Sequence, residues 1–386
     1  MKLLLSILLV VNITTALAQQ AETIIIGTRE REYYVHLPKN YEVTSALIPL
    51  VIGLHGANQQ PVDGVNSYAS MTGLNAKADA ENFIVVYPVG LGSDVFSVPV
   101  WNAGKCCPPA SSPNVKMEDV QFISALIDKL VATYHIHKSR VYATGFSNGA
   151  MMCQRLMCEL STKIAAVGAH SGSYMVEGEC KPVRPVPMIY LHATKDSVVP
   201  YNGGTGVLSN TLVFPSVDST MHIWQTILNC TMQEQSVFDI ATAKGSAWQS
   251  STSSTELQRY YATDGGHWWI GSPVGIGSKA FNATDIIWNF LKRFTLENPT
   301  DVFEQTEQQE SNWIVFTNAM QQTILRFQTY QSNISIRVTD VLGREVIKQE
   351  QQQGLDIPVQ TAQLPHGVYV LQITNGKTQQ TKTILL

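Results

Sequence analysis

One serine of the sequence stands in a setting that suits a nucleophile. Gly145-Phe146-Ser147-Asn148-Gly149 follows the strand-like segment Arg140 to Thr144 and leads into the helical segment Gly149 to Leu160. A serine on such a sharp strand-to-helix turn projects its hydroxyl above a sheet, and the flanking glycines leave room for neighbouring backbone. Because the same pattern also fits an ordinary strand-to-helix turn, the partner residues decide its interpretation.

A serine nucleophile needs a histidine base and an acid that orients the imidazole. Asp196 follows the strand-like segment that ends at Leu191, in a loop where an open α/β sheet carries functional residues. On its own, Asp196 also fits a turn aspartate. His267 follows the strand-like segment Leu257 to Ala262, and Gly265-Gly266 give its loop backbone freedom.

Three other acids lie between the serine and the histidine, and each is a poorer candidate. Asp218 falls in a predicted helix and Asp239 inside a predicted strand, whereas Asp264 is too close to His267 to come from a different strand. The sequence therefore predicts ester hydrolysis through three residues. The nucleophile, the base and the orienting acid are Ser147, His267 and Asp196.

The charged intermediate of acyl transfer needs backbone N–H donors. We expect one donor from Asn148, directly after the nucleophile, and the other from Ala57 in Leu54-His55-Gly56-Ala57-Asn58, where His55 would be structural. Since water releases the acyl group, we expect no cofactor and no metal. Flat rings would suit an aromatic acyl group or a sugar face. The candidate substrate-binding aromatics are Trp101, Tyr201, Trp268 and Trp269.

The elements that must position these residues form an α/β pattern. Apolar runs of strand length without alternation are typical of a parallel sheet buried on both faces. These runs are Ile48 to Leu54, Phe83 to Tyr87, Arg140 to Thr144, Ile164 to Val167 and Val186 to Leu191. Helical segments alternate with them and predict helices on both faces. They are Met117 to Tyr134, Gly149 to Leu160, Ser216 to Leu228 and Asp285 to Phe294, after an opening hairpin within Glu22 to Leu37.

The two ends of the chain differ from this unit. Lys2, the apolar run Leu3 to Val11 and Ala16-Leu17-Ala18 predict a signal peptide over 1–18, so the α/β unit spans 19–296. Residues 297–312 are polar and predict a linker. Short alternating segments in 313–386 predict a small all-β sandwich. They are Thr323 to Thr329, Ile334 to Thr339, Gly367 to Thr374 and Thr378 to Leu385.

Composition narrows the classes of protein. Of the 386 residues, 44% are hydrophobic and 15% are charged, which excludes bulk disorder. The net charge is −4 and the sequence has no basic patch, so we expect no nucleic-acid partner. We also expect a monomer. In an exported chain six cysteines allow up to three disulfides in 15 connectivities, all open here, and their spacing is not that of a zinc site. The cysteines are Cys106, Cys107, Cys153, Cys158, Cys180 and Cys230.

Several motifs occur together in the order of one family. Residues 22–296 resemble the secreted polyhydroxybutyrate depolymerase and feruloyl esterase group of α/β-hydrolases. The resemblance implies the same triad and an α/β-hydrolase fold. Ala57 stands where this group often has cysteine and Ile270 where it commonly has proline, which leaves substrate preference open. The motifs are Leu54 to Gln59, Trp101 to Cys107, Glu118 to Val120, Gly145 to Met152, Asp196 to Tyr201 and Gly265 to Trp269.

The C-terminal segment resembles the sorting domain of the type IX secretion system. The matching residues are Val338 to Val346, Leu364 to Ile373 and Thr381 to Leu386, although the family often ends in a lysine-containing tail that Leu385-Leu386 lacks. The resemblance implies recognition by the secretion machinery at the outer membrane. A carbohydrate-binding β-sandwich is the alternative.

Together these patterns predict a secreted serine carboxylesterase that removes feruloyl or acetyl groups from plant polysaccharide. A polyhydroxybutyrate depolymerase is the alternative enzyme. A non-catalytic surface binding protein with a hydrolase shell is the alternative outside catalysis, and the complete triad argues against it. A membrane-acting lipase is a weaker idea, because no long apolar lid segment stands out.

Overall fold

The structure is a computed structural model of the whole chain. It describes residues 21–41, 46–64, 67–92, 99–107, 119–208, 211–275, 277–296, 313–317, 323–340, 344–365, 368–376 and 378–385. The predicted signal peptide over 1–18 and the linker over 297–312 lie outside these described residues, so both stay predictions.

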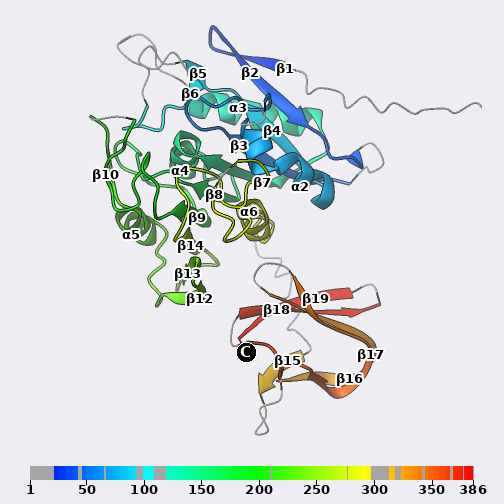
Figure 1. Cartoon of the computed structure of the whole chain (residues 1–386). Helices are drawn as coiled ribbons and strands as arrows, with labels where there is room; N and C mark the ends of the chain where they lie inside the picture. The colour runs from blue at the N-terminus through cyan, green and yellow to red at the C-terminus, as the bar shows by residue number, and fades with distance from the viewer. Residues whose placement is uncertain are drawn as a thin grey trace, which may run out of the picture.

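A ten-stranded sheet with the order β1-β2-β4-β3-β7-β8-β9-β14-β13-β12 forms the main body (Figure 1). The strands from β4 to β14 in this order run parallel, and antiparallel strands extend the sheet at both edges. The predicted parallel α/β sheet is therefore confirmed. The strands are β1 (Ala21–Ile26), β2 (Arg29–His36), β3 (Ile48–Leu54), β4 (Ile84–Pro88), β7 (Ile136–Phe146), β8 (Ala166–His170), β9 (Met188–Ala193), β12 (Gln235–Ile240), β13 (Ala243–Gln249) and β14 (Glu256–Ala262).

Helices cover both faces of this sheet, because its central strands are apolar on both faces. Leu50 and Ile52 of β3 pack in one core with α3, α4 and α5, whereas Val51 between them packs in a second core with α1, α2 and α6. This two-sided arrangement is that of an α/β-hydrolase fold. The helices are α1 (Tyr68–Thr72), α2 (Leu74–Glu81), α3 (Asp119–Thr133), α4 (Asn148–Glu159), α5 (Val217–Ile227) and α6 (Ala283–Leu291).

Two short ribbons lie in the loops of this body. β5 (Leu91–Gly92) pairs with β6 (Pro99–Val100), and β10 (Gly204–Thr205) pairs with β11 (Val213–Phe214). The second ribbon belongs to the long connection between β9 and α5, which also carries Asp196.

The C-terminal region is a separate five-stranded antiparallel sheet, described here by itself. Its two long strands carry several register shifts, and side chains from both halves of β16 are buried in one core. The predicted small all-β region is confirmed, but the two strands expected at 323–329 and 334–339 are one continuous strand. The strands are β15 (Trp313–Thr317), β16 (Thr323–Asp340), β17 (Glu345–Val359), β18 (Val368–Asn375) and β19 (Thr378–Leu385).

Four of the six cysteines form disulfides. Cys106 pairs with its neighbour Cys107, and Cys158 pairs with Cys180. Cys153 and Cys230 are buried free thiols. The upper expectation of three bridges is therefore not reached. No helix within the described residues is both long enough and apolar enough to cross a membrane.

Candidate active site

Ser147 occupies a sharp turn between β7 and α4. Its φ of 55° and ψ of −120° are strained for a residue other than glycine. The Ser147 N–H donates to the His170 carbonyl at the end of the neighbouring strand β8, with an N–O distance of 2.9 Å. The serine thus stands at the carboxyl edge of the parallel strands, as the sequence predicted.

The glycines on either side of Ser147 are there for space. A Cβ atom on Gly145 would collide with the Gly149 carbonyl, and a Cβ atom on Gly149 would collide with the Leu54 carbonyl at the end of β3. Helix α4 therefore packs directly on the sheet backbone. Any larger residue at either position would push the nucleophile turn away from β3.

Asp196 and His267 come together from the ends of β9 and β14. His267 Nδ1 lies 2.7 Å from Asp196 Oδ2, and the imidazole ring packs on Phe146 with 4.7 Å between the ring centroids. Parallel pairing of β9 with β14 brings the two loops together, and the Thr194 N–H donates to the Ala262 carbonyl just beyond the pairing. The His267 side chain is 14% exposed, which leaves it open to solvent beside the residue that precedes Ser147.

The Asp196 carboxylate accepts hydrogen bonds on both oxygens. Oδ1 accepts from the N–H groups of Val198 and Val199 at 2.9 Å each, whereas Oδ2 faces His267 and the ring of His192. Burial raises the pKa of this carboxyl, but the bonds from His192 and His267 outweigh burial and hold the pKa well below its usual range. Asp196 is therefore ionised at neutral pH, as an orienting acid must be.

Two backbone N–H groups, those of Ala57 and Asn148, are the predicted donors of an oxyanion hole. Among the described residues the N–H of Ala57 has no hydrogen-bond acceptor. The N–H of Asn148 opens helix α4, where the first N–H groups have no partner within the helix. The N–H of Gly56 is not available as an oxyanion donor, because it donates to the Gln59 side chain at 2.9 Å. The choice of Ala57 over its neighbour therefore agrees with the hydrogen bonding.

His55 has the structural role expected of it. Its Nε2 accepts from the Gly90 N–H at 2.9 Å, so the hydrogen is on Nδ1, which donates to the Gly56 carbonyl at 2.7 Å. Complete burial lowers the pKa of His55 to about 4. This neutral ring therefore ties the Ala57 loop to the chain beyond β4.

The prediction that Trp101 contacts substrate is wrong, because its side chain is fully buried. Its indole N–H donates to the His55 carbonyl at 3.0 Å, and its backbone N–H and carbonyl both bond the side-chain amide of Asn148. Next to it, the Asn102 N–H donates to Asp119, which forms a buried ion pair with Arg31. Trp101 thus fastens its loop to the first residue of helix α4.

Of the other three aromatic candidates, one is buried and two are partly exposed. Trp269 is also fully buried, because its ring stacks on His170 and its indole N–H donates to Thr284 at 2.9 Å. Its predicted contact with substrate is therefore wrong as well. Trp268 and Tyr201 are partly exposed on the loops that carry His267 and Asp196. They stay candidates for substrate contact.

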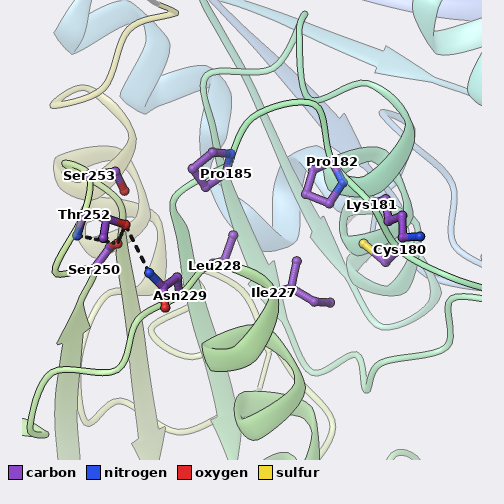
Figure 2. A pocket seen from close by; sticks show the side chains of 10 residues that line it. All are labelled: Cys180, Lys181, Pro182, Pro185, Ile227, Leu228, Asn229, Ser250, Thr252 and Ser253. Atoms are coloured by element: carbon purple, nitrogen blue, oxygen red, sulfur yellow. Dashed lines mark hydrogen bonds between the residues drawn. The ribbon is translucent and has the colours of Figure 1, made fainter.

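A cavity of about 510 Å³ lies at the other end of the same strands. It is bounded by the chain before β9, the end of α5 and the turn between β13 and β14 (Figure 2). These segments adjoin the amino ends of β9 and β14, whereas Asp196 and His267 follow their carboxyl ends. Its lining residues are Cys180, Lys181, Pro182, Pro185, Ile227, Leu228, Asn229, Ser250, Thr252 and Ser253.

Sequence reasoning missed the histidine beside the acid. His192 is fully buried at the end of β9, with its Nε2 3.3 Å from Asp196 Oδ2. Its position four residues before Asp196 was the available signal, but a strand pattern does not reveal which way a histidine points. In the part of the chain that the structure describes, no cluster of three or more His, Cys, Asp or Glu side chains could hold a metal ion.

Comparisons with known families match two parts of the chain. Residues 48–225 match the family described as Phospholipase/Carboxylesterase, and residues 319–386 match the Secretion system C-terminal sorting domain. The first match covers β3 through most of α5, which includes Ser147 and Asp196. The second confirms the predicted sorting domain, and with it the expectation of secretion.

Curated relatives match part of the chain. A bifunctional acetylxylan esterase/xylanase of Neocallimastix patriciarum is 34% identical over 180 residues, which are 47% of this chain and 23% of that protein. Feruloyl esterase B of Piromyces equi is 27% identical over 69% of this chain and 46% of its own length. A probable feruloyl esterase C of Aspergillus clavatus is 29% identical over 69% of this chain and 85% of its own length.

The chain therefore spans less than half the length of the first two of these relatives. The family recognised from the sequence motifs is nevertheless the one that the comparisons find. Residues 48–225 are thus similar to the phospholipase/carboxylesterase family, and residues 319–386 match a secretion sorting domain.

Proposed function

We propose that this chain is a secreted serine carboxylesterase that hydrolyses feruloyl or acetyl esters on plant polysaccharide. The observation that carries the proposal is the bonded pair of His267 and Asp196, at 2.7 Å, beside the strained turn of Ser147. Nucleophile, acid and base follow the carboxyl ends of β7, β9 and β14 in one sheet, where β8 lies between β7 and β9. That arrangement is what an acyl-transfer triad requires.

In the first step Ser147 Oγ attacks the ester carbonyl, and His267 Nε2 takes the hydroxyl proton. Nε2 is free for this role because Nδ1 donates to Asp196. The ionised carboxylate fixes the tautomer and stabilises the imidazolium that forms. His267 then gives the proton to the leaving alcohol, and an acyl-Ser147 ester remains.

In the second step His267 activates a water molecule, which attacks the acyl-enzyme and releases the carboxylic acid. Both steps pass through a tetrahedral oxyanion. The N–H groups of Ala57 and Asn148 would stabilise this charge, with a rate effect of roughly 10²–10³-fold per donor. No cofactor or metal is needed for either step.

The choice of acyl group and polymer rests on the relatives and on exposed rings. Curated relatives carry the names acetylxylan esterase and feruloyl esterase. The rings of Trp268 and Tyr201 are partly exposed and offer flat apolar faces near the triad. Through the sorting domain, the partner for export would be the type IX secretion machinery.

A second candidate substrate is an apolar polyester such as polyhydroxybutyrate. Three exposed apolar side chains on the connection after Asp196 favour it, namely Val207 at 70%, Leu208 at 73% and Val213 at 64% exposure. The Val207 N–H donates to the Ser197 carbonyl at 2.9 Å, so this surface is fastened to the acid loop.

The test is a substrate panel of methyl ferulate, acetylated xylan, hydroxybutyrate oligomers and p-nitrophenyl acetate, run with wild type and Ser147→Ala. We expect wild type to cleave p-nitrophenyl acetate and at least one of methyl ferulate and acetylated xylan. Cleavage of hydroxybutyrate oligomers alone would instead favour the polyester. If wild type cleaves nothing, or Ser147→Ala is fully active, the serine esterase proposal fails and the binding-protein alternative gains.

A further inference from the structure

We propose that His192 is a positioning residue, which holds the loop and the carboxylate of Asp196 in the geometry that His267 needs. The inference rests on the proposed function, because it assigns a role to a residue that touches the triad acid and no substrate. It starts from the place of His192 as the penultimate residue of β9, four residues before Asp196.

The hydrogen bonds of His192 fix its tautomer. Its Nε2 lies 2.8 Å from the Val199 carbonyl, which can only accept, so Nε2 carries the hydrogen. Its Nδ1 lies within hydrogen-bond distance of the Tyr190 hydroxyl, at 2.9 Å. The ring is fully buried and bonded at both nitrogens.

The Nε2–H group of His192 meets two acceptors on one loop. The Val199 carbonyl accepts at 2.8 Å, and Asp196 Oδ2 lies 3.3 Å from the same nitrogen. Val199 also donates its own N–H to Asp196 Oδ1. The His192 ring thus links strand β9 to the loop 196–199. It also contacts Asp196 Oδ2, the oxygen that bonds His267.

Packing leaves His192 little freedom to move. Its ring is stacked near Tyr190, with an interplanar angle of 22°, and Tyr201 packs against it edge-on at 5.7 Å between centroids. Because His192 belongs to β9 and contacts the loop of Asp196, its packed ring holds Asp196 at a fixed position relative to β9. The surface loop would otherwise depend on backbone turns alone, and a misplacement of about 1 Å can cost roughly 10²-fold in rate.

The positioning role of His192 can be tested through the pH dependence of the rate, given the titratable groups around Asp196. Besides His192 and His267, the titratable groups that influence Asp196 are Tyr190 and His170. Burial raises the pKa of Tyr190 well above its usual value and lowers the pKa of His170 well below its own. Neither group changes charge near neutral pH, so neither contributes a limb to the rate profile there.

The experiment compares His192→Gln with His192→Asn in the full-length protein. The glutamine amide reaches the place of Nε2, whereas the asparagine amide reaches only the place of Nδ1. We expect Asn to lower kcat roughly 10²-fold with KM changed less than about threefold, and Gln to restore most of kcat. With Asn the carboxylate loses a donor, so the acid limb of kcat/KM should move to higher pH.

Two controls separate this role from general packing and from failure of the proposed function. Leu126→Ala, in the core on α3, should lower the melting temperature and leave kcat and the acid limb unchanged. If His192→Asn behaves like Leu126→Ala while Ser147→Ala is inactive, the positioning role is overturned and the esterase proposal stands. If Gln and Asn lose kcat equally although both are folded by circular dichroism, the positioning role is also overturned.

Discussion

The two ends of the same parallel strands teach different lessons about where chemistry is found. At the carboxyl ends, Asp196 and His267 are bonded beside the turn of Ser147. At the amino ends lies a cavity of about 510 Å³, lined mainly by prolines, aliphatic side chains and small polar side chains (Figure 2). This cavity has one ionisable side chain in its lining apart from a disulfide-bonded cysteine, namely Lys181, so strand direction locates the reactive side chains better than the cavity does.

The strongest test of this difference between the two strand ends is to replace one serine at each end by alanine. Ser147→Ala should lower kcat by roughly 10⁴-fold or more, because it removes the nucleophile. Ser250→Ala at the cavity should leave kcat within about twofold of wild type. Hydrolysis of p-nitrophenyl acetate by the two purified variants measures both effects. A loss of activity in Ser250→Ala would mean that the two ends act together.

Asp196→Asn should lower kcat roughly 10⁴-fold, since the amide favours the wrong tautomer of His267. The matched control is Asp264→Asn on the histidine loop, where the carboxylate bonds Ser278 instead of the histidine. Initial rates at neutral pH compare the two variants. Equal losses would mean that the loop, and not the orienting acid, determines the rate.

The same variant tests the depressed pKa of Asp196. A carboxyl whose folded pKa lies below its unfolded pKa stabilises the protein above the unfolded pKa of about 4, and this stability is lost as pH falls. The melting temperature of Asp196→Asn should therefore fall less than that of wild type between pH 6 and pH 3. An identical fall in both proteins would contradict the pKa direction.

Ala57→Pro should lower kcat by roughly 10²–10³-fold, because proline removes the N–H donor expected in the oxyanion hole. Ala57 is exposed at the surface, so Ala57→Ser serves as a control that keeps the donor. We expect the serine variant to be within about threefold of wild type. Stopped-time assays with thermal melts of both variants separate a lost donor from a lost fold.

A smaller effect on rate but a larger effect on stability is expected at the amino end. Replacing Cys158 and Cys180 by serine opens a bridge that closes 22 residues, which should cost about 2–4 kcal/mol of unfolding free energy. Urea titration measures this loss. Since Cys180 lines the cavity and contacts no triad residue, kcat at 25 °C should not change.

The smallest effect is expected from Thr252→Val in the cavity. Thr252 bonds the side chains of Asn229 at 3.0 Å and Ser250 at 3.2 Å, and valine keeps the shape while removing both bonds. We expect about 1 kcal/mol or less of lost stability and a kcat within twofold of wild type. A large fall in kcat would show that the cavity contributes to catalysis.

Much of the fold was predictable because its local signals agree with its tertiary contacts. The run at Ile48 to Leu54 is β3 to the residue, and the helix predicted over 117–134 is α3 over Asp119–Thr133. Helices α1 and α2 were missed, because they are short and α2 has no amphipathic face. The long bent strand β16 was divided in two where register shifts interrupt its alternation.

The places of the three proposed triad residues in the fold were predictable for a different reason from the roles of the residues around them. Ser147, Asp196 and His267 each follow a strand, and strand ends converge by topology. The roles of Trp101, Trp269 and His192 depend on where each ring points, and that is decided by distant partners such as Asn148, Thr284 and Tyr190. Aromatic composition alone could not distinguish the buried rings of Trp101 and Trp269 from partly exposed rings that can contact substrate.

The cysteine arrangement has a consequence for oxidative folding. The bridge between Cys158 and Cys180 joins residues 22 positions apart, so loop-closure entropy favours it over long-range pairs such as Cys153 with Cys230. The other bridge joins the adjacent residues Cys106 and Cys107. Burial then raises the pKa of the Cys153 thiol far above its usual range and that of Cys230 to about 12. The completed fold thereby withholds both thiols from disulfide exchange, and pairing errors are confined to the time before the core closes.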